Sequence, residues 1–209
     1  METKKRVELL APAGNMEKLK TAFHFGTDAC FVGGSAFNLR GMSSNFKNKE
    51  LKEAVDYVHS LGKKIYVTLN IFAHNTEIEY MPRFIKKLDE FGVDAVIVAD
   101  LGVFQMVREH APNMKIHVST QAKNTNWMSV KTWKDMGAKR VILAREMSLK
   151  EIKTIREKVP DVEIEVFIHG AMCMAYSGRC LLSNYFTNRD ANRGICAQDC
   201  RWNYKVIAE

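Results

Sequence analysis

The sequence of 209 residues predicts an α/β protein, specifically a (β/α)8 TIM-type barrel that is either complete or incomplete and distorted at its end. Three observations predict it: eight short runs rich in Val, Ile, Phe or Tyr, amphipathic stretches between them, and a repeated phrase in which a helix stops before a strand. Such runs are typical of strands buried on both faces. The predicted strands are Val7–Leu10, Ala29–Val32, Lys64–Leu69, Ala95–Val98, Lys115–Val118, Arg140–Leu143, Glu163–Ile168 and Tyr204–Ile207.

The stretches between the strands carry helix start and stop signals. Asn15 is placed to cap a helix that ends at Gly26. Pro82 suits the first turn of a helix that ends at Gly92. Asp100 can cap the next helix. Further helices are predicted after Asn48, after the Asn124-Thr125-Asn126 cluster, and after Ser148-Leu149-Lys150-Glu151, which fits a capping box.

A weak internal repeat supports this count of elements. Three helices end in similar phrases, each of which leads straight into a strand: Phe25-Gly26-Thr27-Asp28-Ala29, Phe91-Gly92-Val93-Asp94-Ala95 and Met136-Gly137-Ala138-Lys139-Arg140. The alternative is an open, doubly wound sheet. No Gly-x-Gly-x-x-Gly phosphate loop follows the first strand, which argues against the dinucleotide-binding version of that fold.

We expect one barrel domain over residues 1–209, with a Cys-rich insertion at 171–203 in the last crossover. The sequence stops directly after the predicted eighth strand, whereas a barrel needs a final helix to cover that strand. We therefore expect either the N-terminal part of a longer protein, without its C-terminal domain, or a covering helix supplied from elsewhere.

The lack of an export signal favours a cytoplasmic protein, and the net charge favours a polyanionic partner. No run of about 18 apolar residues predicts a membrane span. The apolar run near the N-terminus is too short for a signal peptide. The net charge of +7 suits a polyanion such as RNA, although many cytoplasmic proteins carry such a charge without binding nucleic acid.

Polar residues follow the predicted strands, where a barrel of this type carries its catalytic groups. As a set they could line a pocket for a small anionic molecule. The candidates are Asn70, Asp100 and Gln121 for cofactor binding, and Arg145, Glu146 and His169 for catalysis.

Simpler roles remain open for the same residues. Asp100 also fits as a helix cap, and Arg145 and Glu146 could pair with neighbours on the rim. His169 could act as an acid or base, donate to a cluster sulfur, or be a core histidine with one satisfied nitrogen.

The strongest signal is the spacing Cys173-x₆-Cys180-x₁₅-Cys196-x₃-Cys200, because the first 172 residues hold only Cys30. Four thiols in a reducing compartment indicate Zn²⁺ or an iron–sulfur cluster. Zinc knuckles usually have closer cysteine pairs, whereas a [4Fe–4S] cluster accepts looser spacings. Cys30 lies inside a predicted strand and is interpreted as a core residue.

Basic and aromatic residues are interleaved with these cysteines. Arginine with aromatic rings can hold phosphates and stack an unpaired base. Alternatively, the aromatic rings shield the cluster and the arginines are merely solvated. The RNA-binding candidates are Arg179, Arg189, Arg193, Arg201, Tyr185 and Trp202.

The segment Glu165–Ser183 resembles the signature of the U32 "peptidase" family, which is named after collagenase-like proteases. The segments Glu8–Gly14 and Phe31–Gly34 are similar to the same family. Asn184–Phe186 and Cys200–Tyr204 look most like its tRNA-hydroxylating branch. The resemblance covers essentially the whole chain.

The resemblance implies oxygen-independent hydroxylation of RNA bases. The tRNA branch makes 5-hydroxyuridine at the wobble position, with prephenate as the implied hydroxyl source. It also implies a [4Fe–4S] cluster on four cysteines. Three of them correspond to Cys173, Cys180 and Cys196. The fourth corresponds to Cys200, although some branches of the family place this ligand further along the chain. The implied partners are the tRNA anticodon loop and a small anionic metabolite.

Two other functions are weighed against this one. A peptidase would need a nucleophile, but neither Gly-x-Ser-x-Gly nor His-Glu-x-x-His occurs, and a thiolate bound to a metal is not free to attack. The other alternative is a non-catalytic RNA-binding module stabilised by the cluster.

Overall fold

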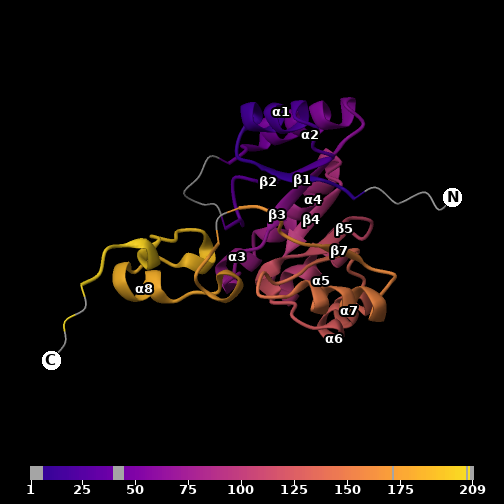
Figure 1. Ribbon diagram of the computed structural model, residues 1–209. Helices are drawn as coiled ribbons and strands as arrows, with labels where there is room; N and C mark the ends of the chain where they lie inside the picture. Colours follow the sequence, from indigo (N-terminus) through magenta and orange to yellow (C-terminus); the bar gives the residue numbers. More distant parts are fainter. Residues whose placement is uncertain (1–6, 40–44, 171, 206, 208–209) are drawn as a thin grey trace.

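The chain folds around one parallel sheet whose seven strands follow one another in sequence order. The computed structural model describes residues 7–39, 45–170, 172–205 and 207. The strands are β1 (Leu10–Ala13), β2 (Ala29–Gly33), β3 (Lys64–Leu69), β4 (Ala95–Val98), β5 (Lys115–Val118), β6 (Arg140–Ile142) and β7 (Glu163–Glu165). Each strand pairs in parallel with the next one, which confirms the predicted α/β class (Figure 1).

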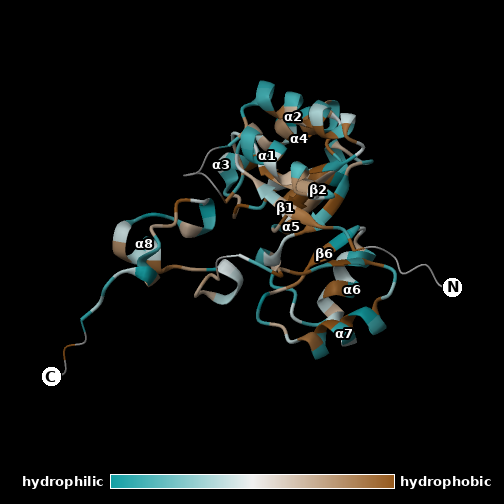
Figure 2. Ribbon diagram, turned by 45° about the horizontal axis from the view of Figure 1, so that its top comes forward, coloured by the Kyte–Doolittle hydropathy of each residue, from teal (hydrophilic) through white to brown (hydrophobic). Residues whose placement is uncertain are grey.

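The six longer helices of the described chain connect successive strands and pack on one face of the sheet (Figures 1 and 2). The α-helices are α1 (Met16–His24), α2 (Asn48–Ser60), α3 (Asn75–Ile78), α4 (Met81–Phe91), α5 (Leu101–His110), α6 (Trp127–Asp135), α7 (Leu149–Lys158) and α8 (Leu182–Thr187). The short helices α3 and α8 were not predicted. Among the described residues, no helix combines the length and apolar character that crossing a membrane requires.

The helix ends follow the predicted signals. The side chains of Asn15, Asp100 and Ser148 each accept the backbone N–H of the residue three positions later, as N-caps do. Gly92 ends α4 in the left-handed conformation, with φ of 78°, which glycine adopts without steric cost. The N-caps therefore fix where α1, α5 and α7 begin, and Gly92 fixes where α4 ends before the next strand.

Three central strands, β3, β4 and β5, have the predicted bounds, whereas β1 begins at Leu10, three residues later than expected. Strand β1 therefore includes Pro12, which has no N–H to donate. A proline is tolerated there because β1 lies at the edge of the sheet and pairs with β2 alone.

The predicted eighth strand is wrong for the described residues. Tyr204, Lys205 and Ile207 have no strand structure, and Val206 lies outside the described residues. The Tyr204 hydroxyl instead donates to the Asp199 carbonyl at 2.8 Å. Local contacts within the Cys-rich region therefore hold this part of the chain, and the described sheet stays open between β7 and β1.

Successive side chains of each strand point to opposite faces of the sheet, and the two faces differ in chemistry. The outer face joins the helices in a continuous apolar core, with strand members such as Cys30, Val67, Val96, Val118 and Val141. The inner face carries a smaller apolar cluster of Ala29, Tyr66, Ala95, Ile97 and Ile142. Apolar residues alone therefore do not fill the inner face.

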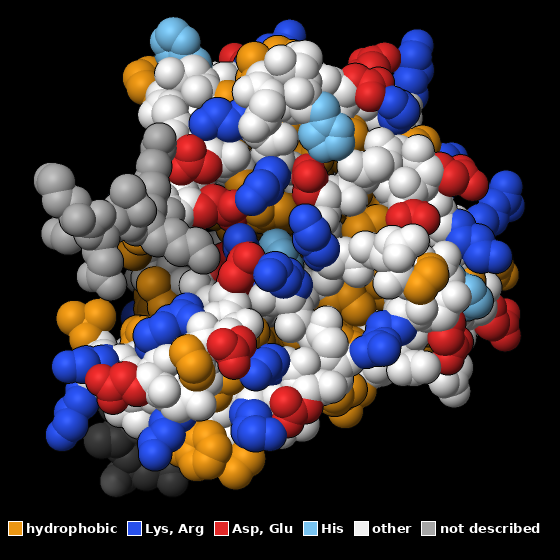
Figure 3. Space-filling model, turned by 90° about the vertical axis from the view of Figure 1, so that its right-hand side faces the viewer, with side chains coloured by type: hydrophobic (Ala, Val, Ile, Leu, Met, Phe, Trp, Pro, Cys, Tyr) orange, Lys and Arg blue, Asp and Glu red, His pale blue; other side chains and the backbone are white. Residues whose placement is uncertain are grey.

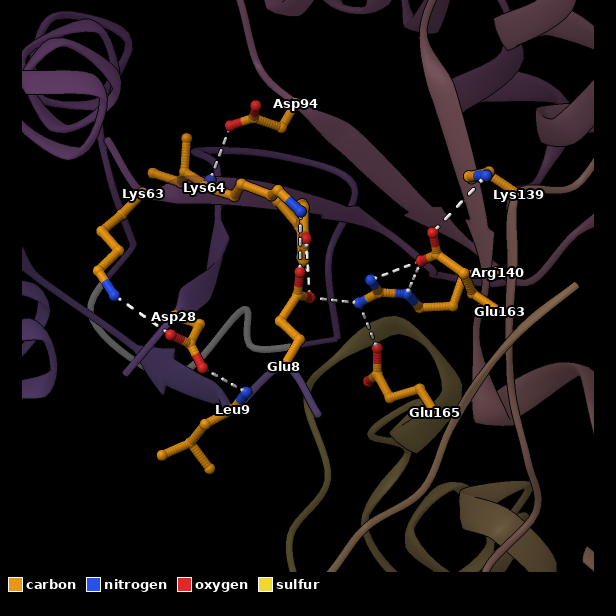
Figure 4. A network of polar contacts seen from close by, with 12 residues as sticks. Glu8, Leu9, Asp28, Lys63, Lys64, Asp94, Lys139, Arg140, Glu163 and Glu165 are labelled. Atoms are coloured by element: carbon orange, nitrogen blue, oxygen red, sulfur yellow. Dashed lines mark hydrogen bonds and ion pairs between the residues drawn. The ribbon is translucent and has the colours of Figure 1, made fainter. Parts of the chain in front are cut away.

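Charged groups complete the inner face at the N-terminal ends of the strands (Figure 4). The Arg140 side chain, 10% exposed, lies within hydrogen-bond distance of Glu8 (2.8 Å), Glu163 (2.7 Å) and Glu165 (3.3 Å). The Tyr66 hydroxyl also donates to Glu8, at 2.8 Å. Since Glu8 precedes β1 and Glu163 lies in β7, Arg140 links the two edges of the open sheet.

The same end of the molecule forms a shallow hollow in which a histidine lies among side chains of both charges (Figure 3). A cavity of about 30 Å³ there is lined by His117, Tyr66 and Arg140, among others. Burial, reinforced by the Arg140 charge, lowers the pKa of His117 to about 3. The imidazole is therefore neutral, and its ring packs edge-on against Tyr66 at 4.6 Å between centroids.

The pKa of Glu8 shows how strongly this network holds a carboxylate. Burial raises this pKa, but hydrogen bonds from Arg140, Lys64 and Tyr66 outweigh burial and lower it to about 2. A carboxylate whose pKa is lower in the folded than in the unfolded state adds stability above its unfolded pKa. That contribution is lost as the pH falls from about 4.5 towards 2.

We predict that Arg140→Met lowers the free energy of unfolding by about 3 kcal/mol, because it leaves buried carboxylates without their cation. Urea titration at neutral pH measures the change. The matched control is Lys139→Met, which removes an exposed cation 3.7 Å from Glu163 and should cost less than about 1 kcal/mol. Equal losses in the two variants would contradict the role given to Arg140.

Candidate functional site at the carboxyl-terminal rim

The Cys-rich segment, defined here as residues 172–202, lies beside the sheet instead of crossing back over it (Figure 1, orange to yellow). It consists of α8 and three single turns: η2 (Tyr176–Gly178), η3 (Ala191–Arg193) and η4 (Asp199–Arg201). Two sets of contacts attach it to the C-terminal ends of the strands. This rim is where catalytic groups collect in α/β barrels.

The first attachment joins η2 to the ends of β5 and β6. Both carboxylate oxygens of Glu146 accept hydrogen bonds from Ser177, one from its N–H and one from its hydroxyl, each at 2.5 Å. Ser177 is buried and has φ of 45°, an unusual conformation for serine that the tertiary contacts must maintain. The neighbouring Gly178 has φ of 84°, which glycine adopts without steric cost, and a Cβ there would lie 2.6 Å from Nε2 of Gln121.

The second attachment joins η3 to the end of β3 and to α3. The Phe72 N–H donates to the Asn192 carbonyl at 3.1 Å, and the Arg179 guanidinium lies 4.7 Å from the centroid of the Phe72 ring. Arg193 forms an ion pair with Glu77 of α3. The two turns that make these attachments lie on opposite sides of Cys180 in the sequence, with η2 before it and η3 after it.

Asn192 connects the second attachment to a candidate metal ligand. Its side chain, in a residue only 6% exposed, accepts the Cys180 N–H at 3.2 Å and donates to the Cys180 carbonyl at 2.9 Å. The backbone of Cys180 is therefore fixed by a residue whose own carbonyl is bonded to the rim. No motif in the sequence singled out Asn192.

The four cysteines of the segment are free thiols, two of them half-buried and two exposed. Backbone N–H groups point at two of the sulfurs: Leu182 to Sγ of Cys180 and Gln198 to Sγ of Cys196, each at 3.3 Å. Within the described part of the chain, no three His, Cys, Asp or Glu side chains converge as a metal site would require. The structure therefore does not bring the four predicted ligands together.

The chemistry of the donors nevertheless fits a metal or cluster bound by thiolates. N–H donors directed at sulfur stabilise negative charge on a ligating thiolate. Asp199, next to Cys200, is 1% exposed, and neither carboxylate oxygen has a hydrogen-bond partner among the described residues. A buried carboxylate in this state requires an explanation, and an ion or group nearby is one.

The predicted RNA-binding arginines also hold the segment together. Arg189 donates to the carbonyls of Ile195 (2.9 Å) and Cys196 (3.4 Å), and Arg201 donates to the Met172 carbonyl at 2.9 Å. With Arg179 on Phe72 and Arg193 on Glu77, each of the four arginines has a protein contact. They are therefore held in place rather than freely mobile on the surface.

An exposed aromatic cluster lies on the same segment. The Phe186 ring contacts Tyr185 (5.2 Å between centroids), Tyr204 (6.2 Å) and Trp202 (6.4 Å). Tyr185 is 81% exposed and Trp202 is 47% exposed. Exposed rings of this kind present faces on which a base can stack.

The predicted catalytic residues fall into different situations. Glu146 is committed to Ser177, and its hydrogen bonds help lower its pKa against the opposing effect of burial. The Arg145 guanidinium lies 5.7 Å from the Phe167 ring centroid, and its Nε is buried without a partner among the described residues. His169 is exposed, beyond the end of β7.

The predicted cofactor-binding residues also differ. Asp100 caps α5 through the Val103 N–H, the simpler of its two proposed roles. Asn70 accepts the Leu39 N–H at 3.4 Å. Oε1 of Gln121 is buried without a partner in the described part of the chain, as are both side-chain polar atoms of the fully buried Asn124.

The sequence profile of peptidase family U32 matches residues 14–209. The chain is 52% identical over 202 residues to tRNA hydroxylation protein P1 of Bacillus subtilis (strain 168), covering 97% of this chain and 48% of that protein. It is 49% identical over 199 residues to tRNA hydroxylation protein P of Escherichia coli (strain K12), covering 95% and 44%. A 23S rRNA 5-hydroxycytidine synthase of Escherichia coli (strain K12) is 41% identical, over 96% of this chain and 30% of that protein. The chain thus spans at most about half the length of these curated relatives.

Two solved structures share the fold. The structure of the U32 peptidase Mk0906 has a TM-score of 0.63 at 16% identity, covering 79% of this chain and 70% of that one. An oxaloacetate acetylhydrolase has a TM-score of 0.58 at 9% identity, covering 79% and 67%. At these identities the likeness shows the α/β fold alone.

We predict that Glu146→Ala detaches η2 from the rim, because it removes both acceptors of Ser177. Hydrogen exchange of the Ser177 amide should accelerate at least tenfold, equivalent to losing about 1.4 kcal/mol of protection. Glu53→Ala, at an exposed position of α2, is the matched control and should leave this amide unchanged. Unaltered exchange in Glu146→Ala would show that other contacts hold η2.

Proposed function

The chain belongs to peptidase family U32, and we propose that it is part of a protein that hydroxylates the wobble uridine of tRNA at position 5, with prephenate as the hydroxyl source. The observation that carries this proposal is the identity of 47–52% to three tRNA hydroxylation proteins over at least 95% of the chain. We further propose that the seven strands are part of a (β/α)8 barrel and that the protein acts in the cytoplasm.

Within this proposal, Cys173, Cys180, Cys196 and Cys200 hold a [4Fe–4S] cluster, with zinc as the alternative metal. The N–H groups directed at two of the sulfurs support it. When bound, the cluster would supply electrons or a binding position for an oxygen-bearing group. Asn192, Glu146 and Ser177 are positioning residues: Asn192 fixes the backbone of Cys180, and the Glu146–Ser177 contact fixes the η2 turn between Cys173 and Cys180.

Arg145 and Gln121 are the proposed contacts of the small anionic metabolite. Each has a buried polar atom without a partner among the described residues, so each has hydrogen-bonding capacity left for a ligand. Arginine also matches carboxylates in geometry and charge. His169 as acid or base, and Asn70 and Asp100 as cofactor ligands, stay predictions.

The anticodon loop is proposed to bind across the Cys-rich segment. Tyr185 and Trp202 supply exposed rings for stacking, and Arg179, Arg189 and Arg201 supply positive charge held close to the segment backbone. The fourth predicted arginine, Arg193, is paired with Glu77 and would contact the RNA without adding net charge. Bases of an anticodon loop are unpaired, so stacking them costs no base pairs. A peptidase mechanism has no comparable support, since no hydrogen bond between described residues joins His169 to a cysteine.

We predict that protein purified without oxygen contains about four irons per chain and absorbs broadly near 400 nm, as [4Fe–4S] proteins do. Cys173→Ser and Cys180→Ser should lose most of the iron. The matched control is Cys30→Ala: this thiol is buried in β2, its pKa is raised to about 12 by burial, and iron content should not change. One zinc per chain and no iron would overturn the cluster proposal.

We predict that deleting the gene removes 5-hydroxyuridine-derived nucleosides from the wobble position, because the proposed reaction forms the bond between position 5 of the uridine and the hydroxyl oxygen. Mass spectrometry of purified tRNA measures it. Restoring the gene should restore the nucleoside, and restoring it with Cys180→Ser should not. An unchanged tRNA profile after deletion would overturn the proposed activity, whatever the metal content of the protein.

A further inference from the structure

A cavity of about 310 Å³ opens where the ends of β2 and β3 meet the Cys-rich segment. This volume is at the lower end of the range of about 300–1,000 Å³ found for small-molecule sites. It is separate from the Arg145–Gln121 end of the rim, which lies after β5 and β6. Its lining comes from Ser35, Ala36, Phe37, Asn38, Asn45, Ile71, Glu77 and Arg193.

Two consecutive glycines create the room for this cavity's polar groups. A Cβ at Gly33 would lie 2.5 Å from Oδ1 of Asn45 and 3.0 Å from Cγ of Asn38. A Cβ at Gly34 would lie 2.7 Å from Cζ of Phe84. The two glycines therefore leave room for two amide side chains and an aromatic ring at the end of β2.

The amides are held in place as well as admitted. Asn38, which is 5% exposed, donates from Nδ2 to the Gly34 carbonyl at 2.8 Å. Asn70, at the end of β3, accepts the N–H of the adjacent Leu39. The loop that lines the cavity is thus fastened to two strand ends.

Phe37 stands in this cavity with φ of 62°, in the left-handed region that bulky residues avoid. Its ring packs against Phe84 at 5.6 Å between centroids and is only partly buried. Strained conformations of this kind cost about 1–3 kcal/mol and concentrate where a site needs a group in one position. The left-handed conformation here places an aromatic ring at the wall of the cavity, beside amide side chains.

The charge balance indicates which kind of molecule fits. The cation of Arg193 is paired with the carboxylate of Glu77, so the described lining residues carry no net charge. Among these described residues an anion would find no unpaired cation, whereas amides beside aromatic and apolar groups match a neutral, planar ring with donors and acceptors on its edge.

We propose that this cavity receives the unpaired pyrimidine base that is modified, an inference that rests on the proposed RNA function. Phe37 offers its face to the ring, and the amides of Asn38 and Asn45 contact the base edge. Enzymes that act on a base read it by such edge contacts and stacking once it leaves its neighbours.

The cavity is also coupled to the candidate cluster. Arg193, which lines it, directly follows Asn192, whose side chain holds the backbone of Cys180. A base in the cavity and a metal on Cys180 would therefore share one short turn of chain, η3.

The test is photo-crosslinking of the anaerobically purified chain to an anticodon stem-loop RNA with 4-thiouridine at the wobble position. Peptide mass spectrometry locates the crosslink, which should fall on the β2 loop segment that contains Ser35–Leu39 or on Ile71. A crosslink confined to Tyr185 or Trp202, or no crosslink in a protein that binds the RNA, would overturn the pocket. The tRNA profile after gene deletion tests the proposed function independently of this outcome.

Matched variants separate stacking from folding. Phe37→Leu should reduce the crosslink yield about tenfold, consistent with the stacking energies measured for unpaired bases. Phe37→Tyr should keep it, and Phe25→Leu, at an exposed ring on α1's end, is the control. Iron content should stay constant in all three. If Asn45→Ala instead abolishes prephenate binding while leaving the crosslink intact, the cavity belongs to the anion and the inference fails.

Discussion

The contacts of Arg140 are the constraint on which the geometry of this molecule depends. An open sheet of seven strands has two edges, and the guanidinium links Glu8, ahead of β1, to Glu163 and Glu165 in β7. Apolar packing against the helices fixes the outer face, but the inner face has only a small apolar cluster. Burying a network of charges costs desolvation free energy, so the network specifies the geometry of the sheet more than it adds net stability. The network links the two edges at the N-terminal end of the sheet, opposite the rim that carries the Cys-rich segment.

That rim provides the two attachments of the Cys-rich segment. One uses Glu146 and Ser177 after β6, and the other uses Phe72, Asn192 and the Arg193–Glu77 pair after β3. Both consist of hydrogen bonds, ion pairs and ring contacts rather than buried apolar surface. Because polar contacts are directional, they specify how the segment is oriented more sharply than apolar packing would.

Residues whose role is local could be predicted from the sequence, and residues whose role depends on distant partners could not. Strands β3, β4 and β5 and the caps Asn15, Asp100 and Ser148 follow from runs and spacings within a few positions. The predicted strand at Tyr204–Ile207 had a suitable composition, but Tyr204 is bonded to Asp199 instead of a neighbouring strand. Arg140, Asn192 and Phe37 likewise act through partners up to 132 residues away or through an unusual φ, which composition does not encode.

The side chains buried inside the Cys-rich segment indicate that burial of apolar surface alone does not hold the segment together. Its buried side chains are polar, namely those of Ser177, Ser183, Asn192 and Asp199, whereas Leu181, Tyr185 and Met174 are more than 70% exposed. The buried apolar core of the described chain ends at Val162. A segment of this size that buries no apolar side chain gains little from the hydrophobic effect, and small modules in that position are usually held by disulfides or a metal. Bonds from the thiolates to a metal, which the proposed cluster would supply, are a source of stability of that kind. The burial pattern of the segment is therefore a second observation, besides the cysteine spacing, that fits the proposed cluster.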